Sequence, residues 1–199
     1  MTTIDDVQAG TGNSYGLIFD IEMKEQLLSL TVLGMDILLD IDGSIAYEIF
    51  TRVGSWRDLD MSLAISFQQS FESVATGTTT EGGLIRIPMD DLGDSILSST
   101  ETRRTFWISL NGEGLVYKDH DGVSLESADE MKQKSSSDFD LFYGRAIMHY
   151  PFANPRQDFQ EEKGFVGRLW YSAVPKPTEV SQRKYYSSSH HYFVMTNYS

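Results

Sequence analysis

Between Tyr15 and Trp56, apolar and polar residues follow one another in the alternating pattern that is typical of extended strands. The first segment alternates Leu17, Phe19, Ile21 and Met23 with Ile18, Asp20, Glu22 and Lys24. The next, Leu27–Leu39, is apolar on both faces, which indicates a bent or central strand. A period of two with a polar second face predicts half-buried antiparallel strands.

The rest of the chain repeats this pattern in short segments separated by glycine and other turn residues. About ten short strands predict an all-β fold, and we expect a two-sheet antiparallel β-sandwich of jelly-roll type. We expect a loop at residues 75–83, where the side chains are small and polar. Trp107 and Trp170 lie within strand patterns and are expected in the core. The other predicted core residues are Phe19, Ile21, Leu30, Val32, Ile37, Tyr47, Ile49, Phe106, Ile108, Leu141 and Leu169.

A length of 199 residues suits a single domain, which we place at residues 15–174. Residues 1–14 are expected to form a flexible lead-in. After residue 174 the composition changes, and 175–199 reads as a tail or linker, with docking on a sheet edge as an alternative.

The net charge of −13 limits the partners that this chain can attract. Such a surface repels nucleic acid and anionic membranes, because phosphate binding needs clustered lysine and arginine. The absence of cysteine excludes disulfides and a thiolate nucleophile. No apolar run approaches the roughly 20 residues of a membrane span, so no membrane insertion is expected. The polar N-terminus is no signal peptide, and we expect an excised part of an extracellular or cell-surface protein, with an intracellular protein as the alternative.

Three blocks of sequence carry a resemblance to a known family. These are GSIAYEIFTRVGSW (43–56), ETRRTFWISL followed by GLVYKD (101–119), and DFDLFYGRAIMHYPF followed by FVGRLWY (138–171). In order and spacing they resemble a poorly characterised all-β module of secreted and surface-associated proteins in diatoms and some bacteria. The resemblance covers residues 15–173 and departs at Gly144-Arg145, where an acidic residue often precedes the glycine. It implies a fold and a setting, but no activity.

One acidic segment has the spacing of a partial calcium loop. Asp119, Asp121 and Glu126 surround Gly122, and calcium prefers converging oxygen ligands around a tight turn. The full EF-hand pattern is absent, because Tyr117 stands where its first aspartate belongs. Calcium is therefore the one candidate cofactor, with a solvated acidic turn as the alternative.

A second group of residues could bind a ligand. Trp56 and the turn around Pro151 are expected to be exposed, and the nearby arginines could bind carboxylate or sulfate groups of a polysaccharide. The same arginines could instead satisfy backbone carbonyl groups. The candidate ligand-binding residues are Trp56, Arg145, Tyr150, Phe152 and Arg156.

These observations leave three classes of function open. The first is a non-catalytic binding or adhesion module of the cell surface or matrix, with a glycan or a surface protein as its partner. The second is a glycan-active hydrolase or lyase, although we assign no catalytic residue, since no G-x-S-x-G, HExxH or P-loop motif is present. The third is a structural protein that assembles with itself through sheet edges.

Overall fold

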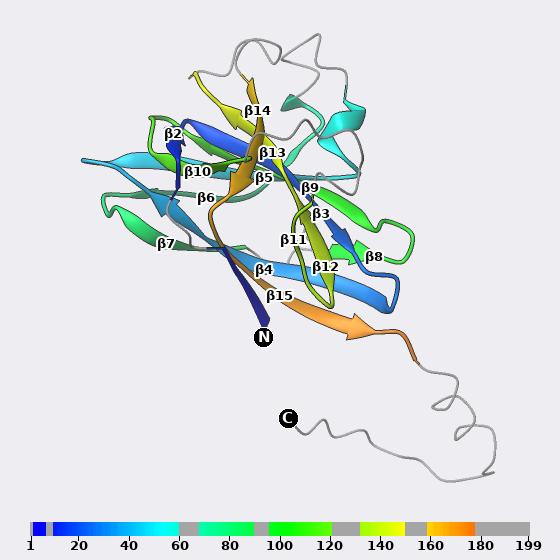
Figure 1. Ribbon diagram of the computed structural model, residues 1–199. Coiled ribbons are helices and arrows are strands. Elements are labelled where there is room, and N and C mark those ends of the chain that lie inside the picture. The colour runs from blue at the N-terminus through cyan, green and yellow to red at the C-terminus, as the bar shows by residue number, and fades with distance from the viewer. Residues whose placement is uncertain are drawn as a thin grey trace, which may run out of the picture.

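The structure is a computed structural model that describes residues 2–6, 10–59, 68–89, 96–120, 132–149 and 159–177. These residues form fifteen strands and one short 3₁₀ helix, η1 (Trp56–Asp58). Figure 1 shows how the strands are arranged. The strands are β1 (Thr2–Asp6), β2 (Gly12–Ser14), β3 (Gly16–Met23), β4 (Leu27–Leu39), β5 (Ile45–Val53), β6 (Glu72–Thr79), β7 (Gly83–Pro88), β8 (Ile96–Ser98), β9 (Arg103–Leu110), β10 (Leu115–Asp119), β11 (Lys132–Ser135), β12 (Phe139–Phe142), β13 (Gly144–Ile147), β14 (Phe159–Phe165) and β15 (Gly167–Pro175). The prediction of an all-β fold is confirmed.

Every strand pair is antiparallel, and the strands join in one hydrogen-bonded path. Its order is β1-β15-β4-β10-β14-β13-β3-β9-β5-β6, while β2, β7, β8, β11 and β12 pair along its sides. The path curls on itself into a nearly closed, barrel-like shape (Figure 1). The chain changes its pairing partner at Val166, between β14 and β15. Phe165 of β14 pairs with Tyr117 of β10, whereas Gly167 of β15 pairs with Ile37 of β4.

The interior of the curled sheet is filled by the side chains that the alternation predicts. Ten of the predicted core residues are at most 1% exposed: Phe19, Ile21, Leu30, Val32, Ile37, Ile49, Phe106, Ile108, Leu141 and Leu169. The remaining one, Tyr47, is half-buried and packs against the same cluster. Leu30 and Val32 of β4 enter this core, and so do Met35 and Ile37, because a register shift between Val32 and Gly34 changes which alternate residues face inward. This shift explains why β4 carries apolar residues on both faces.

A second apolar cluster covers the outer face of β3, β5 and β9. Ile18 and Trp107 point outward from the barrel and are covered by Trp56 of η1 and by Phe71. Phe50 stacks on Trp107 with ring centroids 4.7 Å apart. The polar second face that the alternation predicts for β3 is therefore buried in this region, because a short crossing segment packs on it.

Three local predictions are corrected by the structure. The N-terminal segment expected to be flexible contributes β1 and β2, which pair with β15 and β10. Part of the loop predicted at 75–83 is strand, because β6 pairs with β5 and β7 with β4. Trp107 is buried, but in the outer cluster, whereas Trp170 is only half-buried beside Arg86. Within the part of the chain that the structure describes, no helix is long and apolar enough to cross a membrane.

Candidate functional site

Asp20, on the outer face of β3, is the most deeply buried charged residue among those that the structure describes. Its side chain is 0% exposed. Ser55 Oγ donates to one carboxylate oxygen at 2.5 Å, and Thr105 Oγ1 donates to the other at 2.6 Å. The Arg57 guanidinium adds an ion pair at 3.1 Å, and the backbone N–H of Trp56 approaches at 3.4 Å. Asp20 thus binds the segment around η1 to two strands of the sheet.

The turn that presents these donors is encoded locally. Gly54 adopts a φ of 84°, a conformation that glycine reaches without strain. Ser55 follows as the N-cap of η1, and its hydroxyl accepts from the backbone N–H of Arg57 at 3.1 Å. Asp58 stands three residues after the serine, as in a capping box. Trp56, 5% exposed, anchors the turn in the outer cluster.

Opposing effects act on the ionisation of Asp20. Burial raises the pKa of its carboxyl group, because an ionised carboxylate loses hydration inside the protein. The hydrogen bonds from Ser55 and Thr105 and the charge of Arg57 act against this increase. The carboxylate is thus held by fixed donors rather than by water.

Two arginines lie on the ring of Trp56. The guanidinium carbon of Arg57 is 4.4 Å from the ring centroid, and that of Arg145 is 4.8 Å away. At such distances the aromatic face attracts the cation. Arg57 Nη2 also donates to the carbonyl of Tyr143 at 2.7 Å, which links η1 to the residue just before β13.

A β-bulge sets the position of Arg145 on β13. Opposite it, β14 carries one extra residue, because Gly144 pairs with Lys163 whereas Arg145 pairs with Glu161. The extra residue, Glu162, has a φ of 59°, the left-handed conformation that bulges commonly use. A bulge of this kind redirects neighbouring side chains.

A third arginine, Arg103 of β9, lies near Arg57. It forms an ion pair with Glu22 at 2.5 Å, and its guanidinium lies 4.5 Å from the ring centroid of Phe142. Burial lowers the pKa of Arg57 and repulsion from Arg103 adds to this, although Asp20 opposes both. Burial and repulsion from Arg57 likewise lower the pKa of Arg145.

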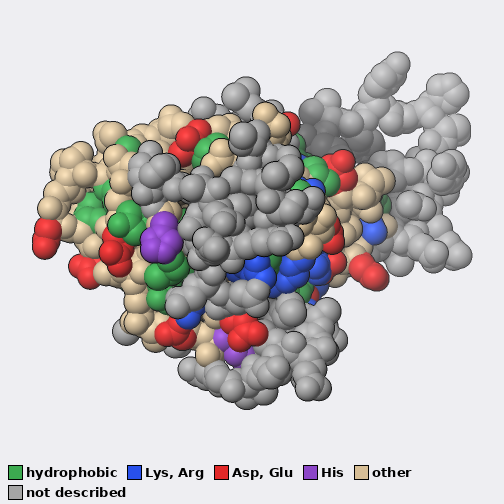
Figure 2. Space-filling model, turned by 90° about the horizontal axis from the view of Figure 1, so that it is seen from above, with side chains coloured by type: hydrophobic (Ala, Val, Ile, Leu, Met, Phe, Trp, Pro, Cys, Tyr) green, Lys and Arg blue, Asp and Glu red, His purple; other side chains and the backbone are tan. Residues whose placement is uncertain are grey.

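We call Arg57, Arg103 and Arg145 the arginine cluster. The face seen from the side of β13 and β14 shows lysine and arginine side chains grouped together (Figure 2). Each guanidinium offers planar, directed N–H donors that match a carboxylate or a sulfate group. An anion bound here would gain these donors and relieve the repulsion between the cations, so anion binding is the chemistry that this arrangement favours.

The structure brings together two of the predicted ligand-binding residues and corrects one expectation. Arg145 lies on the ring of Trp56, as a common site requires. The expectation that Trp56 is exposed is wrong, because its side chain is 5% exposed and packs in the outer cluster. The arginines lie on its ring. Tyr150, Phe152 and Arg156 lie outside the described residues.

The predicted calcium residues are only partly described. Asp119 forms an ion pair with Lys163, and this contact lowers the pKa of its carboxyl group. Asp121 and Glu126 lie outside the described residues. Among the residues that are described, no three acidic or histidine side chains are grouped so that they could hold a metal ion. The calcium site therefore stays a prediction.

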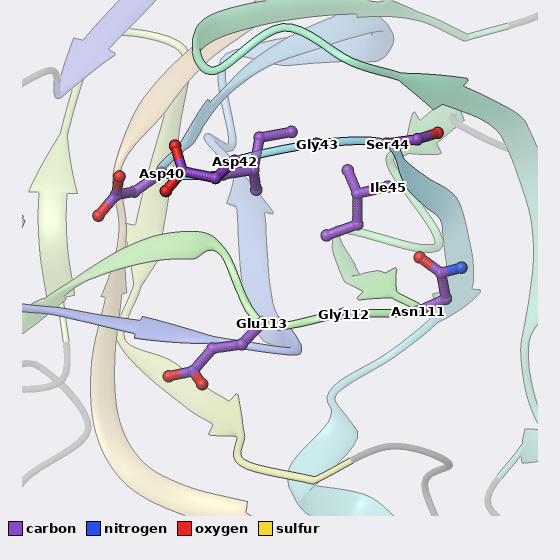
Figure 3. A pocket seen from close by; sticks show the side chains of 9 residues that line it. Asp40, Asp42, Gly43, Ser44, Ile45, Asn111, Gly112 and Glu113 are labelled. Carbon is purple, nitrogen blue, oxygen red and sulfur yellow. The ribbon is translucent and has the colours of Figure 1, made fainter.

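An open pocket of about 350 Å³ lies between two turns, 40–45 and 111–113. It is lined by Asp40, Asp42 and Glu113, and Figure 3 shows the side chain of Glu113 directed away from the two aspartates. Asp40 accepts a hydrogen bond from Asn13 Nδ2 at 3.1 Å. Because Glu113 is directed away from the aspartates, the carboxylates of this pocket do not converge on a common position where a cation could bind.

A second arginine–tryptophan stack lies elsewhere on the sheet. Arg86 of β7 lies 3.8 Å from the ring centroid of Trp170 of β15, and the indole N–H donates to Asp36 at 2.9 Å. Arg86 is also 3.7 Å from Asp36, which is buried. This stack has the same residue types as the candidate site, but among the contacts described only one arginine lies on its ring. A substitution of Arg86 is therefore a suitable control for substitutions in the arginine cluster.

Sequence reasoning missed Asp20, Ser55 and Arg57. The motif Ser55-Trp56-Arg57-Asp58 is a capping-box signature directly after a glycine, so a short helical turn could have been predicted there. No local signal identifies Asp20, because its burial depends on this turn packing on β3 from 35 residues further along the chain. No protein-family model matches this chain, and a search of curated proteins finds no match either.

Proposed function

We propose that this chain is a non-catalytic binding module that recognises an anionic ligand, such as a glycan carrying carboxylate or sulfate groups, at the arginine cluster. The observation that carries the proposal is that Arg57 and Arg145 lie on the same Trp56 ring, with Arg103 near enough to repel Arg57, on a chain with a net charge of −13. On an acidic protein, a group of arginines of this kind gives anions a place to bind.

The preorganisation of the cluster supports recognition. Arg57 and Arg145 are held by the Trp56 ring, and Arg57 is also tied to Asp20 and to the Tyr143 carbonyl. Side chains that are already ordered lose little conformational entropy when a ligand binds. Trp56 thereby acts as a support for the cations, and sugar stacking on an exposed tryptophan is not part of the proposal.

The role of Asp20 favours binding over hydrolysis. Acid–base hydrolysis needs a carboxyl group that reaches the substrate. Both oxygens of Asp20 accept from protein donors, and the side chain is fully buried. Asp20 is therefore a positioning residue in this proposal, and the hydrolase or lyase alternative has no described carboxylate pair in its favour.

The setting and the finer fold assignment belong to the same proposal. The resemblance of the blocks at 43–56, 101–119 and 138–171 to a surface-associated module supports an extracellular or cell-surface location. A two-sheet, jelly-roll-like sandwich arrangement is likewise proposed, from the many short strands separated by turn residues. The wider partner would then be a matrix polysaccharide or an acidic surface protein.

Calorimetric titration with sucrose octasulfate, and with sucrose as the uncharged control, tests the proposal. We expect the sulfated sugar to bind and sucrose not to bind. Arg145→Gln should weaken binding about tenfold to a hundredfold, since a hydrogen bond to a charged group contributes about 1.5–3 kcal/mol. Binding should also weaken as the salt concentration rises.

Arg86→Gln is the matched control, because it removes an arginine from the other tryptophan stack. It should leave the affinity unchanged. Equal losses in both variants would reduce the effect to the overall charge of the protein and contradict the proposal. Incubation with a longer sulfated polysaccharide should leave its chain length unchanged, whereas shortening would support the enzyme alternative.

A further inference from the structure

The hydrogen-bonded path of strands ends at β6. Within the described part of the chain, β5 is the strand that pairs with it and none pairs with its other side. Every second residue of such a strand directs its backbone N–H and C=O groups away from the sheet. An edge of this kind is a template for another strand.

The other edge strands carry features that oppose pairing. The sequence of β1 includes Asp5 and Asp6, and β11 carries Lys132 and Lys134. β7 carries Arg86 and ends at Pro88, which has no N–H group to donate. β2 and β8 are only three residues long. Charges, proline and short length are the usual means by which proteins prevent edge-to-edge association.

β6 has none of these protections between Ser73 and Thr79. No residue in this run is charged, and the side chains of Thr76 and Thr78 are exposed. A register shift beside Val74 leaves residues 75–79 in regular pairing with β5. Side-chain packing also holds this regular stretch in place. Ala75 packs against the core, and the Tyr47 side chain lies against Gly77.

We propose that β6 is a self-association surface, at which the β6 strands of two copies of this chain pair antiparallel about a twofold axis at Gly77. In this register Thr76 of one copy faces Thr78 of the other, and threonine pairs across antiparallel strands are favourable. A twofold axis closes the assembly at two copies, since each copy uses the same surface. Two molecules with a net charge of −13 repel each other, and an uncharged edge is where this repulsion opposes contact least.

Sedimentation equilibrium over a range of protein concentrations tests this inference. The chain mass is 22.5 kDa, and we expect the apparent mass to rise towards twice this value as the concentration increases. The double substitution Thr76→Lys with Thr78→Lys places like charges across the twofold axis and should hold the mass at that of one chain. Its circular dichroism spectrum and melting temperature should match those of the wild type, because both side chains face solvent.

Ser172→Lys is the matched control, since Ser172 is exposed on β15 but pairs with β4. This variant should dimerise as the wild type does. A wild-type mass of one chain at every concentration up to about 1 mM, where even about 4 kcal/mol of binding free energy gives dimer, would overturn the inference. Dimers that persist in the double variant would also overturn it, because another surface would then be responsible.

Discussion

Replacing Asp20 with alanine should lower the free energy of unfolding by about 3 kcal/mol, since breaking a buried ion pair leaves its partner uncompensated. The substitution removes an acceptor from Ser55 Oγ, Thr105 Oγ1 and Arg57 at once, although Thr105 Oγ1 keeps the Gly54 carbonyl at 2.9 Å. A buried donor without an acceptor destabilises the folded state, because it has lost its hydrogen bonds to water and forms none in the protein. Urea denaturation of the two proteins measures the difference.

Glu22→Gln is the control for Asp20, because Glu22 lies two residues further along the same strand and pairs with Arg103. Its side chain is 37% exposed, so we expect a loss of less than about 1 kcal/mol. Losses of equal size in the two variants would contradict the central position given to Asp20.

The pH dependence of stability offers an independent check on Asp20. Because burial raises the pKa of this carboxyl in the folded protein above its ordinary value of 3.8, the folded state holds the proton more tightly than the unfolded chain does. The associated stabilisation is complete below pH 3.8 and is lost as the pH rises through the folded pKa. The stability advantage of the wild type over Asp20→Asn should therefore shrink over this rise in pH. An advantage that grows with pH would contradict the sign of the shift.

Replacing Gly144 with alanine should also destabilise the fold by about 3 kcal/mol, at the upper end of the range for overpacking. A Cβ atom at this position would lie 1.6 Å from the carbonyl oxygen of Ile18 and 2.9 Å from the Cα atom of Phe19. Both are backbone atoms of β3, so β13 would have to move away from its neighbour. Arg145 follows directly, and the same movement should carry it from Trp56 and weaken binding of sucrose octasulfate.

Gly112→Ala provides the comparison for Gly144. Its added Cβ atom would meet the end of the Ile45 side chain at 3.4 Å, an ordinary contact with a flexible group. We expect a change within about 0.5 kcal/mol, as for other surface substitutions. Thermal melts of both variants, with the titration repeated on each, distinguish a local clash from a general need for glycine. A stable Gly144→Ala variant with unchanged affinity would contradict the close approach of β13 to β3.

The alternation in the sequence predicts which residues fill the interior, but it does not reveal what covers the outer face. Phe19 and Ile21 lie on the core side because a period of two puts them there. Asp20 lies on the opposite side, and its burial depends on η1, which comes from a distant part of the sequence. Composition also misleads at the edge of the sheet, because residues 75–79 resemble a loop and become strand only through pairing with β5.

The candidate site was predictable to the extent that residue type indicates chemistry. Trp56 was predicted as an exposed aromatic residue, and Arg145 as an arginine near the Pro151 turn that could bind carboxylate or sulfate groups. This reasoning did not predict that the tryptophan is buried beneath two arginines, because the position of Arg57 depends on a cap, a glycine turn and an ion pair to another strand.

The most direct test of the arginine cluster is a nuclear magnetic resonance titration of ¹⁵N-labelled protein with sucrose octasulfate. We expect shifts of the Nε–H signals of Arg57 and Arg145 and of the Trp56 indole N–H, which lie together at the site. The signals of Arg86 and the Trp170 indole, in the other stack, should stay in place. Shifts confined to Arg86 and Trp170, or no shift at any of these signals, would contradict the assignment of anion binding to the arginine cluster.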